Sequence, residues 1–106
     1  MKLLIVDDHP MVREGLAATL RQFAADVQVL QAADGTQALA LTAAHADLSA
    51  AWVDLRMAGM GGFTTVEQLR RRHPALPVIV LSSSEDPDDV RRSLLAGARG
   101  YCPKSA

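Results

Sequence analysis

The stretch Leu-Leu-Ile-Val-Asp-Asp at residues 3–8 sets the pattern of the chain, because it is a short apolar run that ends in residues with reactive groups. The pattern recurs where residues 50–53 lead into Asp54, residues 78–81 into Ser82 and residues 101–103 into Lys104. A short continuous apolar run is typical of a parallel strand buried on both faces. Since parallel strands of an open sheet present ligands at their carboxyl ends, we expect these side chains to share one site.

Helical patterns separate the apolar runs. Pro10 suits the first turn of a helix, and apolar residues then recur at helical spacing at Val12, Leu16, Leu20 and Phe23. Residues 27–32 predict a second strand, and Asp34 is expected to cap an Ala-rich helix over residues 36–44. The first half of the chain therefore alternates strand and helix.

The second half repeats this alternation. Residues 59–62 are expected to form a loop before a helix that turns Val66 and Leu69 inward and stops before Pro74. Asp86 and Pro87 predict the start of the next helix. On that helix we expect one face to carry Val90, Leu94 and Gly97. The order βαβαβαβαβ predicts an α/β fold, a doubly wound parallel sheet with right-handed crossovers.

Composition limits the classes of function. The 106 residues, 49% of them apolar, suffice for one domain with an aliphatic core, and a net charge of −1 argues against a nucleic-acid surface. The basic run at residues 70–72 is best read as a solvated helix end, with a phosphate or nucleic-acid patch as the alternative. The single cysteine, Cys102, is expected to be a small core residue. With no signal peptide or long apolar stretch, the sequence predicts a soluble, cytoplasmic protein without a membrane segment.

Asp7, Asp8 and Asp54 are candidate ligands of a magnesium ion. Two adjacent carboxylates repel each other, and a hard divalent cation with oxygen ligands relieves that repulsion. The alternative for Asp7 and Asp8 is a helix cap plus a turn acid. Because Asp54 is expected beside them at the same edge, a metal site is the better interpretation.

Asp54 is also a candidate nucleophile, since a carboxylate can attack phosphorus and form an acyl phosphate. Lys104 could pair with Asp54 in the free state and with a phosphoryl oxygen afterwards. Ser82 could donate a hydrogen bond to a phosphoryl oxygen. Taken singly, an ordinary surface lysine and a strand-end serine bonded to backbone remain the alternatives.

The motifs together resemble the receiver (phosphoacceptor) domain of two-component response regulators over essentially the whole chain. They are Leu-Leu-Ile-Val-Asp-Asp-His-Pro at 3–10, Val-Asp-Leu-Arg-Met-Ala-Gly-Met-Gly-Gly at 53–62, Val-Ile-Val-Leu-Ser at 78–82 and Gly-Ala-Arg-Gly-Tyr-Cys-Pro-Lys at 97–104. The stretch from Asp7 to Leu16 further resembles the subfamily with a helix-turn-helix DNA-binding domain. The resemblance implies a flavodoxin-like (βα)5 sheet with strand order 2-1-3-4-5 and one receiver domain over residues 1–106.

The resemblance also implies roles for individual residues. Asp54 would accept a phosphoryl group from a histidine kinase, and Asp7, Asp8, Asp54 and the backbone carbonyl of Arg56 would hold magnesium. Lys104 would pair with a phosphoryl oxygen. Ser82 would be the switch hydroxyl and Tyr101 the aromatic that moves with it, although Tyr101 is equally well read as a plain half-buried strand residue.

Departures from the family pattern modify these expectations. Ala58 stands where proline is usual and Gly61 where an acid or asparagine is common, so the loop after Asp54 should be less rigid. The bond between Lys104 and Ser105 is often cis in the family, but without proline a cis bond costs about 3 kcal/mol and is not assumed. No pattern for a fifth helix is present, and a chain that truly ended at Ala106 would be expected to associate or swap elements.

Three functions compete. The leading one is a stoichiometric phosphoacceptor that is not a turnover enzyme, forms a homodimer through the fourth helix and fifth strand, and controls an output such as transcription without binding nucleic acid itself. A phosphatase with an aspartate nucleophile would need a second acid two residues later, but His9 and Arg56 occupy those positions. The third is a phosphorylation-independent interaction module of the same fold.

Overall fold

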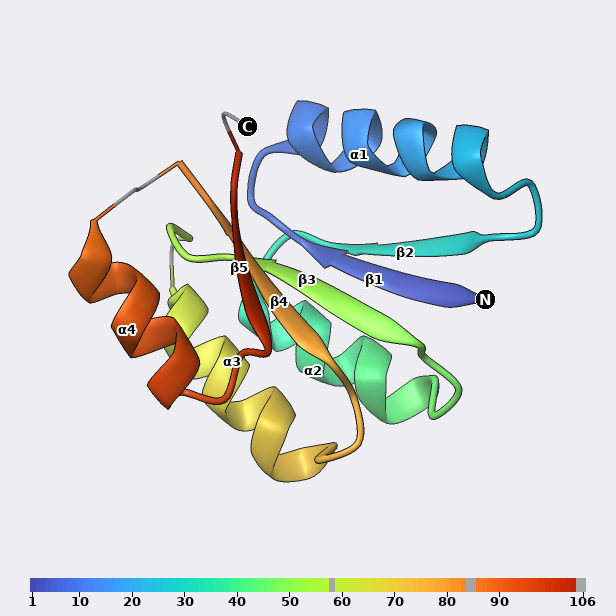
Figure 1. Cartoon of the computed structure of the whole chain (residues 1–106). Coiled ribbons are helices and arrows are strands. Elements are labelled where there is room, and N and C mark those ends of the chain that lie inside the picture. Colours follow the sequence, from blue (N-terminus) through green and yellow to red (C-terminus); the bar gives the residue numbers. More distant parts are fainter. Residues whose placement is uncertain (58, 84–85, 105–106) are drawn as a thin grey trace.

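The computed structural model describes residues 1–57, 59–83 and 86–104 and shows a five-stranded parallel sheet in the order β2-β1-β3-β4-β5 (Figure 1). The order of strands and the alternation with helices are as predicted. The elements are β1 (Lys2–Val6), α1 (Pro10–Phe23), β2 (Gln28–Ala32), α2 (Gly35–Ala44), β3 (Ala50–Asp54), α3 (Gly62–Arg72), β4 (Val78–Ser82), α4 (Pro87–Leu95) and β5 (Gly100–Pro103).

The register brings the carboxyl ends of the strands to one edge. Val6 pairs with Ala32 on one side and Val53 on the other, so β1, β2 and β3 end almost level. On the next strands, Asp54 pairs with Leu81, and Ser82 pairs with Pro103. The residues that follow the strands therefore start from the same edge of the sheet.

Two layers of helices cover the sheet unequally. In Figure 1, α2, α3 and α4 lie against one face, and α1 is the helix on the other face among the described residues. The core fills the first layer, where aliphatic side chains of β1, β3 and β4 meet α2 and α3. Val66 and Leu69 are completely buried there, as predicted from their spacing.

Helix starts follow the predicted caps. The Asp34 side chain accepts a hydrogen bond from the Gln37 amide at 2.8 Å, and Asp86 accepts one from the Asp88 amide at 3.0 Å. These bonds satisfy amides that have no partner within the helix. The predicted loop at 59–62 is one residue too long, because α3 begins at Gly62. Ala58 and the bond from Lys104 to Ser105 fall outside the described residues.

The predicted shared face of Val90, Leu94 and Gly97 on α4 is wrong for Gly97. The helix ends at Leu95, Leu94 is 50% exposed, and Gly97 lies beyond the helix with a φ of +112°. The buried positions of α4 are instead Asp89 and Ser93. They are tolerated because both are bonded: Ser93 Oγ donates to the Asp89 carbonyl at 2.8 Å, and Asp89 pairs with Arg56.

The face beside α1 is incompletely covered. Of the helix, only Ala17 is fully buried, and Phe23 is exposed although its spacing suggested an inward position. A groove of about 380 Å³ runs between α1 and β5, lined by Val12, Leu16, Leu81, Cys102, Pro103 and Lys104. Cys102 is therefore exposed, and its predicted place in the core is wrong. The β5 edge strand turns this residue to the side that no described helix covers.

Candidate functional site

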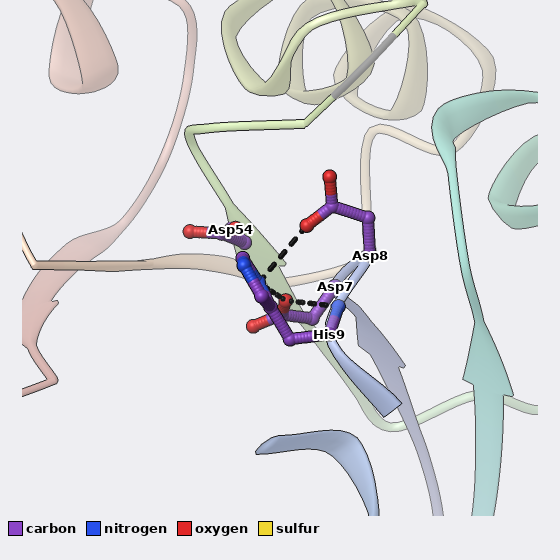
Figure 2. Close-up of side chains that lie close together, drawn as sticks. All are labelled: Asp7, Asp8, His9 and Asp54. Atoms are coloured by element: carbon purple, nitrogen blue, oxygen red, sulfur yellow. Dashed lines mark hydrogen bonds and ion pairs between the residues drawn. The ribbon is translucent and has the colours of Figure 1, made fainter. Parts of the chain in front are cut away.

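Three aspartates and a lysine converge at the carboxyl edge of the sheet. Asp7 and Asp8 follow β1, Asp54 ends β3, and Lys104 follows β5 on the far side of β4. Asp7 and Asp54 are almost fully buried, at 1% and 2% exposed, whereas Asp8 is at the surface. Figure 2 shows the aspartates gathered around the end of β1 together with His9.

Lys104 forms ion pairs with both buried carboxylates. Its Nζ lies 2.9 Å from Asp7 Oδ2 and 3.2 Å from Asp54 Oδ1. The Lys104 amide also donates to the Ser82 carbonyl at 2.7 Å, which fixes the chain just before the ammonium group. A single cation thus bridges two strand ends that are 47 positions apart in sequence, counted from Asp7 to Asp54.

His9 supplies a second contact to the acids, and sequence reasoning did not select it as a site residue. Its Nδ1 lies 2.8 Å from Asp7 Oδ1 and 3.0 Å from Asp8 Oδ1, and its amide donates to Asp7 Oδ1 at 2.9 Å. The sequence signal that could have identified His9 is its position directly after the Asp-Asp pair at the end of a strand.

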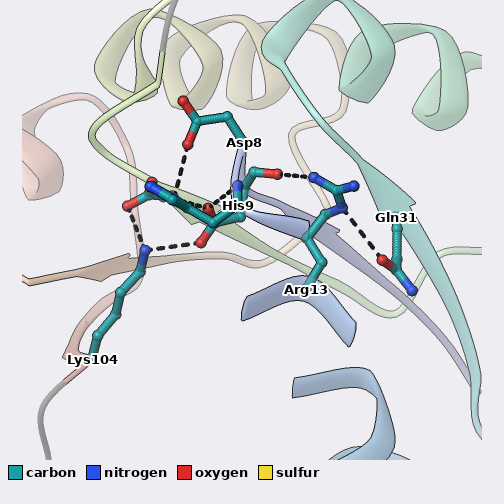
Figure 3. A network of polar contacts seen from close by, with 7 residues as sticks. Asp8, His9, Arg13, Gln31 and Lys104 are labelled. Atoms are coloured by element: carbon teal, nitrogen blue, oxygen red, sulfur yellow. Dashed lines mark hydrogen bonds and ion pairs between the residues drawn. The ribbon is translucent and has the colours of Figure 1, made fainter. Parts of the chain in front are cut away.

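Arg13 is a further contact that the sequence analysis missed. From the first turns of α1 its guanidinium donates to the Asp7 carbonyl at 2.6 Å and to the Gln31 side chain at 3.3 Å (Figure 3). Arg13 lies four residues after His9, one helical turn onward, so both can face the same strand end. The bond to the carbonyl between Asp7 and Asp8 holds the backbone that carries the acidic pair.

Burial and charge move the pKa values of the two buried acids in opposite directions. Burial alone would raise the pKa of Asp7, but hydrogen bonds from Lys104 and His9 outweigh it and hold that pKa below its ordinary value. The pKa of Asp54 is raised, first by burial and then by the neighbouring Asp7 charge, which Lys104 only partly offsets. The Asp7 hydrogen bond raises the pKa of His9, and the two acids raise that of Lys104 against the effect of burial.

The donor set fits a hard divalent cation. Asp7, Asp8, His9 and Asp54 each offer one ligand atom, and these atoms all lie within 4.8 Å of one another. Asp54 Oδ2 is buried and has no hydrogen-bond partner in the described part of the chain, which is costly unless something binds it. Carboxylate oxygens are the ligands that magnesium prefers. The three aspartates predicted to hold magnesium therefore lie close enough together to hold a cation, and the role of the Arg56 carbonyl stays a prediction.

The remaining predicted residues lie around this cluster. Ser82 is fully buried at the end of β4, next to the strand of Asp54. Tyr101 is half-buried on β5, where it pairs with Val80 and packs against the core. The Arg56 side chain points away from the acids and forms an ion pair with Asp89 Oδ2 at 3.1 Å. This geometry leaves open both interpretations of Tyr101.

A doubly wound parallel sheet with an acidic cluster and a paired lysine at its carboxyl edge is typical of α/β domains that bind ligands at the ends of their strands. The comparisons with known proteins resolve the class. The profile of the response regulator receiver domain matches residues 3–106, and the chain belongs to that family. It is a receiver domain of the two-component response regulator type.

Curated relatives are similar over nearly the whole chain. The chain is 36% identical over 105 residues to the glycerol metabolism activator of Pseudomonas putida and to the nitrate/nitrite response regulator protein NarP of Escherichia coli. In both cases the match covers 99% of this chain and 48% of the relative. The chain therefore spans about half the length of these relatives.

Solved structures support the fold. The chemotaxis protein CheY4 of Vibrio cholerae superposes with a TM-score of 0.90 at 30% identity, over 99% of this chain and 87% of that one. The receiver domain of a putative NarL response regulator from Mycobacterium tuberculosis gives 0.87 at 33% identity, over 99% and 84%. Across the described ranges, no helix is long and apolar enough to cross a membrane.

Proposed function

We propose that this receiver domain accepts a phosphoryl group from a histidine kinase onto Asp54, in a reaction that requires Mg²⁺, and changes conformation to control an output. The observation that carries the proposal is the state of the Asp54 carboxylate. One oxygen is held by Lys104 at 3.2 Å and the other is buried without a partner. A nucleophile positioned by one oxygen and unengaged at the other suits attack on phosphorus.

In the proposed transfer, Asp54 is the nucleophile and Lys104 pairs with the phosphoryl group. A bond forms between an Asp54 oxygen and phosphorus as the bond from phosphorus to the donor's imidazole nitrogen breaks, and the departing imidazole keeps that electron pair. Lys104 can remain beside Asp54 and follow the new phosphoryl oxygens, because its ammonium is a mobile point charge. Asp7, Asp8, Asp54 and the carbonyl of Arg56 would hold Mg²⁺, which when bound supplies charge neutralisation for the phosphoryl group.

The proposed switch uses residues on β4 and β5. Phosphorylation adds negative charge and strong acceptor oxygens at one point. Ser82 ends the strand beside Asp54 and would donate to one of these oxygens, while Tyr101 on the neighbouring β5 would repack with it. The phosphoryl group need only bias two conformations that already differ by a few kcal/mol.

The proposed output is transcription, through a part of the protein other than these residues. This rests on the relatives, among which are a metabolism activator and nitrate/nitrite response regulators of twice the length. The 106 residues have a net charge of −1, so they have no positive electrostatic potential that would attract nucleic acid. In this proposal the domain stores one phosphoryl group, is not a turnover enzyme and acts in the cytoplasm.

The proposal includes a homodimer through α4 and β5. Leu94 and Leu95 on α4 are 50% and 77% exposed, which is high for leucine side chains on neighbouring positions. Adjacent exposed apolar side chains are a common feature of protein interfaces. A shift of β5 on phosphorylation would change this surface directly.

The test is intact-protein mass spectrometry after incubation with Mg²⁺ and acetyl phosphate. We expect the parent to gain one phosphoryl group, and Asp54→Asn to gain none. Asp26→Asn, at an exposed aspartate away from the cluster, is the matched control and should react like the parent. Chelation of Mg²⁺ should abolish the gain. An unmodified parent would favour the phosphorylation-independent interaction module instead.

A further inference from the structure

We propose that the imidazole of His9 is itself a ligand of the divalent cation, so that the site accepts nitrogen-preferring transition-metal ions as well as Mg²⁺. This inference rests on the cation site in the proposed function and adds a residue and a metal preference to it. His9 immediately follows the acidic pair and lies within the same 4.8 Å group of ligand atoms as Asp7, Asp8 and Asp54.

The spacing of the His9 nitrogen suits coordination. Its Nδ1 lies 2.8 Å from one Asp7 oxygen and 3.0 Å from one Asp8 oxygen (Figure 2). Two neighbouring ligands of an octahedral ion with bonds of about 2.1 Å are separated by roughly 3.0 Å. The nitrogen and the two oxygens are therefore spaced as they would be around one ion, and a shared proton is the competing explanation.

The buried acid provides the independent sign that a cation belongs here. Asp54 Oδ2 makes no hydrogen bond in the described part of the chain, although Asp54 is 2% exposed. Lys104 already occupies the other Asp54 oxygen and one Asp7 oxygen. A second positive charge among Asp7, Asp8 and Asp54 would satisfy the remaining oxygen, and the His9 nitrogen belongs to the same group of ligand atoms.

His9 has the freedom that a ligand needs. Its side chain is 61% exposed and makes no capping bond to α1, so the ring is held only by the Asp7 and Asp8 carboxylates, the same groups that would share the ion with it. Its position at the start of α1 is fixed by the backbone, because its amide bonds Asp7 and its carbonyl accepts from Val12 and Arg13. The ring can thus turn between the carboxylates and an ion while the chain stays in place.

The nitrogen should change which ions the site prefers. Carboxylate and carbonyl oxygens suit Mg²⁺, whereas imidazole suits Ni²⁺ and Zn²⁺. Because Ni²⁺ binds more tightly than Mg²⁺ even to sites made only of oxygen, the ratio of affinities in the parent decides nothing. The informative quantity is the change in each affinity when the imidazole is removed.

The experiment is isothermal titration of the 106-residue chain with Mg²⁺ and with Ni²⁺, comparing the parent, His9→Ala and His73→Ala. We expect His9→Ala to weaken Ni²⁺ binding by at least about tenfold and to change Mg²⁺ binding by less than about threefold. His73→Ala, at the far end of α3, should change neither. Circular dichroism confirms that the variants are folded.

Two other results would overturn the inference. If His9 only shares a proton with the acids, its removal should strengthen the binding of both ions, because a competitor is lost. Equal weakening of both ions would likewise show that the ring only positions the carboxylates and is not itself a ligand. A direct readout is the ring nitrogen resonance, which Zn²⁺ should shift at His9 Nδ1 and not at His73.

Failure of the proposed function has a different signature. If the parent binds no Mg²⁺, or if Asp8→Asn and Asp54→Asn bind it like the parent, the cation site itself is absent and both proposals fall. If Mg²⁺ binding depends on Asp8 and Asp54 but the Ni²⁺ titration is insensitive to His9, the inference alone is wrong.

Discussion

Asp7 and Asp54 are both buried beside Lys104, but their pKa values are shifted in opposite directions. Asp7 has both oxygens occupied, by Lys104 and by His9, and its pKa is lowered despite burial. Asp54 shares Lys104 through one oxygen only, and its pKa is raised by burial and by the charge of Asp7. The free domain therefore holds its proposed phosphoacceptor in an unfavourable ionised state, which a cation or a phosphoryl group would relieve.

We predict that Asp54→Asn stabilises the cation-free domain at neutral pH. A group whose folded pKa is raised stabilises the fold below its unfolded pKa and loses that contribution as pH rises through the folded pKa. Ionised Asp54 is thus a net cost at neutral pH, and asparagine removes the charge with little change of shape. A gain on the order of 1 kcal/mol would raise Tm by roughly 4–8 °C in thermal denaturation with a chelator present.

The pH dependence of Tm shows whether the stabilisation by Asp54→Asn comes from removal of the carboxylate charge. The gap in Tm between parent and Asp54→Asn should narrow as pH falls toward 3.8, the ordinary pKa of an aspartate, because the parent becomes protonated at the same position. Asp7→Asn should behave oppositely, since a lowered folded pKa stabilises the fold at neutral pH and is lost in acid. A constant gap across pH would contradict the explanation.

The start of α3 is tied to Asp54 through Gly62. The Gly62 amide donates to the Leu55 carbonyl at 3.1 Å, and an added Cβ would overlap the backbone of Leu55 and the carbonyl of Asp54. We predict that Gly62→Ala destabilises the domain by about 1–3 kcal/mol and slows phosphorylation, because the backbone of the acceptor must move. Chemical denaturation and the acetyl phosphate reaction measure the two effects.

Gly15→Ala is the matched control for Gly62→Ala. Gly15 lies in the exposed middle of α1, and an added Cβ there meets no atom within 4 Å. Alanine should stabilise this helix by roughly 0.5–1 kcal/mol and leave phosphorylation unchanged. Similar effects of the two substitutions would show that the contact with Asp54 does not matter.

The ion pair between Arg56 and Asp89 joins the loop after β3 to α4. The Arg56 side chain is 70% exposed, but the Asp89 side chain is only 11% exposed. The ion pair is therefore shielded from solvent on the Asp89 side. We predict a coupling free energy of about 0.5–1.5 kcal/mol in a double-mutant cycle with alanine at both positions. The fully solvated pair of Asp88 and Arg91, at 3.2 Å, should give less than about 0.5 kcal/mol. Equal couplings would argue against a special link from the site to α4.

The elements that could be predicted from the sequence are those whose local signals agree with the global fold. The apolar runs, Asp34 and Pro87 each combine hydrophobicity or capping with a position that the sheet requires, and all are where they were expected. The sequence analysis did not identify the buried positions of α4, because its inward residues, Asp89 and Ser93, are polar and are buried through specific bonds. A hydrophobic period cannot reveal such positions.

The site was predictable from the sequence only in part. The strand-end rule placed Asp7, Asp54 and Lys104 at one edge, since a parallel sheet brings strand ends together whatever their separation in sequence. It did not identify His9 or Arg13, because their contacts depend on how α1 leaves the end of β1. Exposure of Cys102 was likewise a matter of which helix covers β5, which short-range patterns do not contain.

As a whole, the molecule is compact but unevenly covered. Its radius of gyration is 12.6 Å, close to the roughly 13 Å expected for a domain of this length. The helices α2, α3 and α4 cover one face of the sheet (Figure 1). On the other face, a groove lies between α1 and β5. Met11 and Phe23, 87% and 85% exposed, add apolar surface to α1. Lys104 belongs to both the acidic cluster and the lining of this groove, so the site borders the open face.

We predict that the 106-residue polypeptide associates in solution through the open face. Apolar groove walls and exposed apolar side chains favour contact with a second molecule over contact with water. In light scattering over a dilution series, the apparent mass should rise above that of a monomer with concentration. Val12→Lys, which places a charge at the groove wall, should weaken this association, whereas Ala18→Lys on an exposed position of the same helix should not. Association through α4 and β5 should be unaffected by either substitution. A monomer at every concentration would mean that the groove is too small or too well hydrated to drive association.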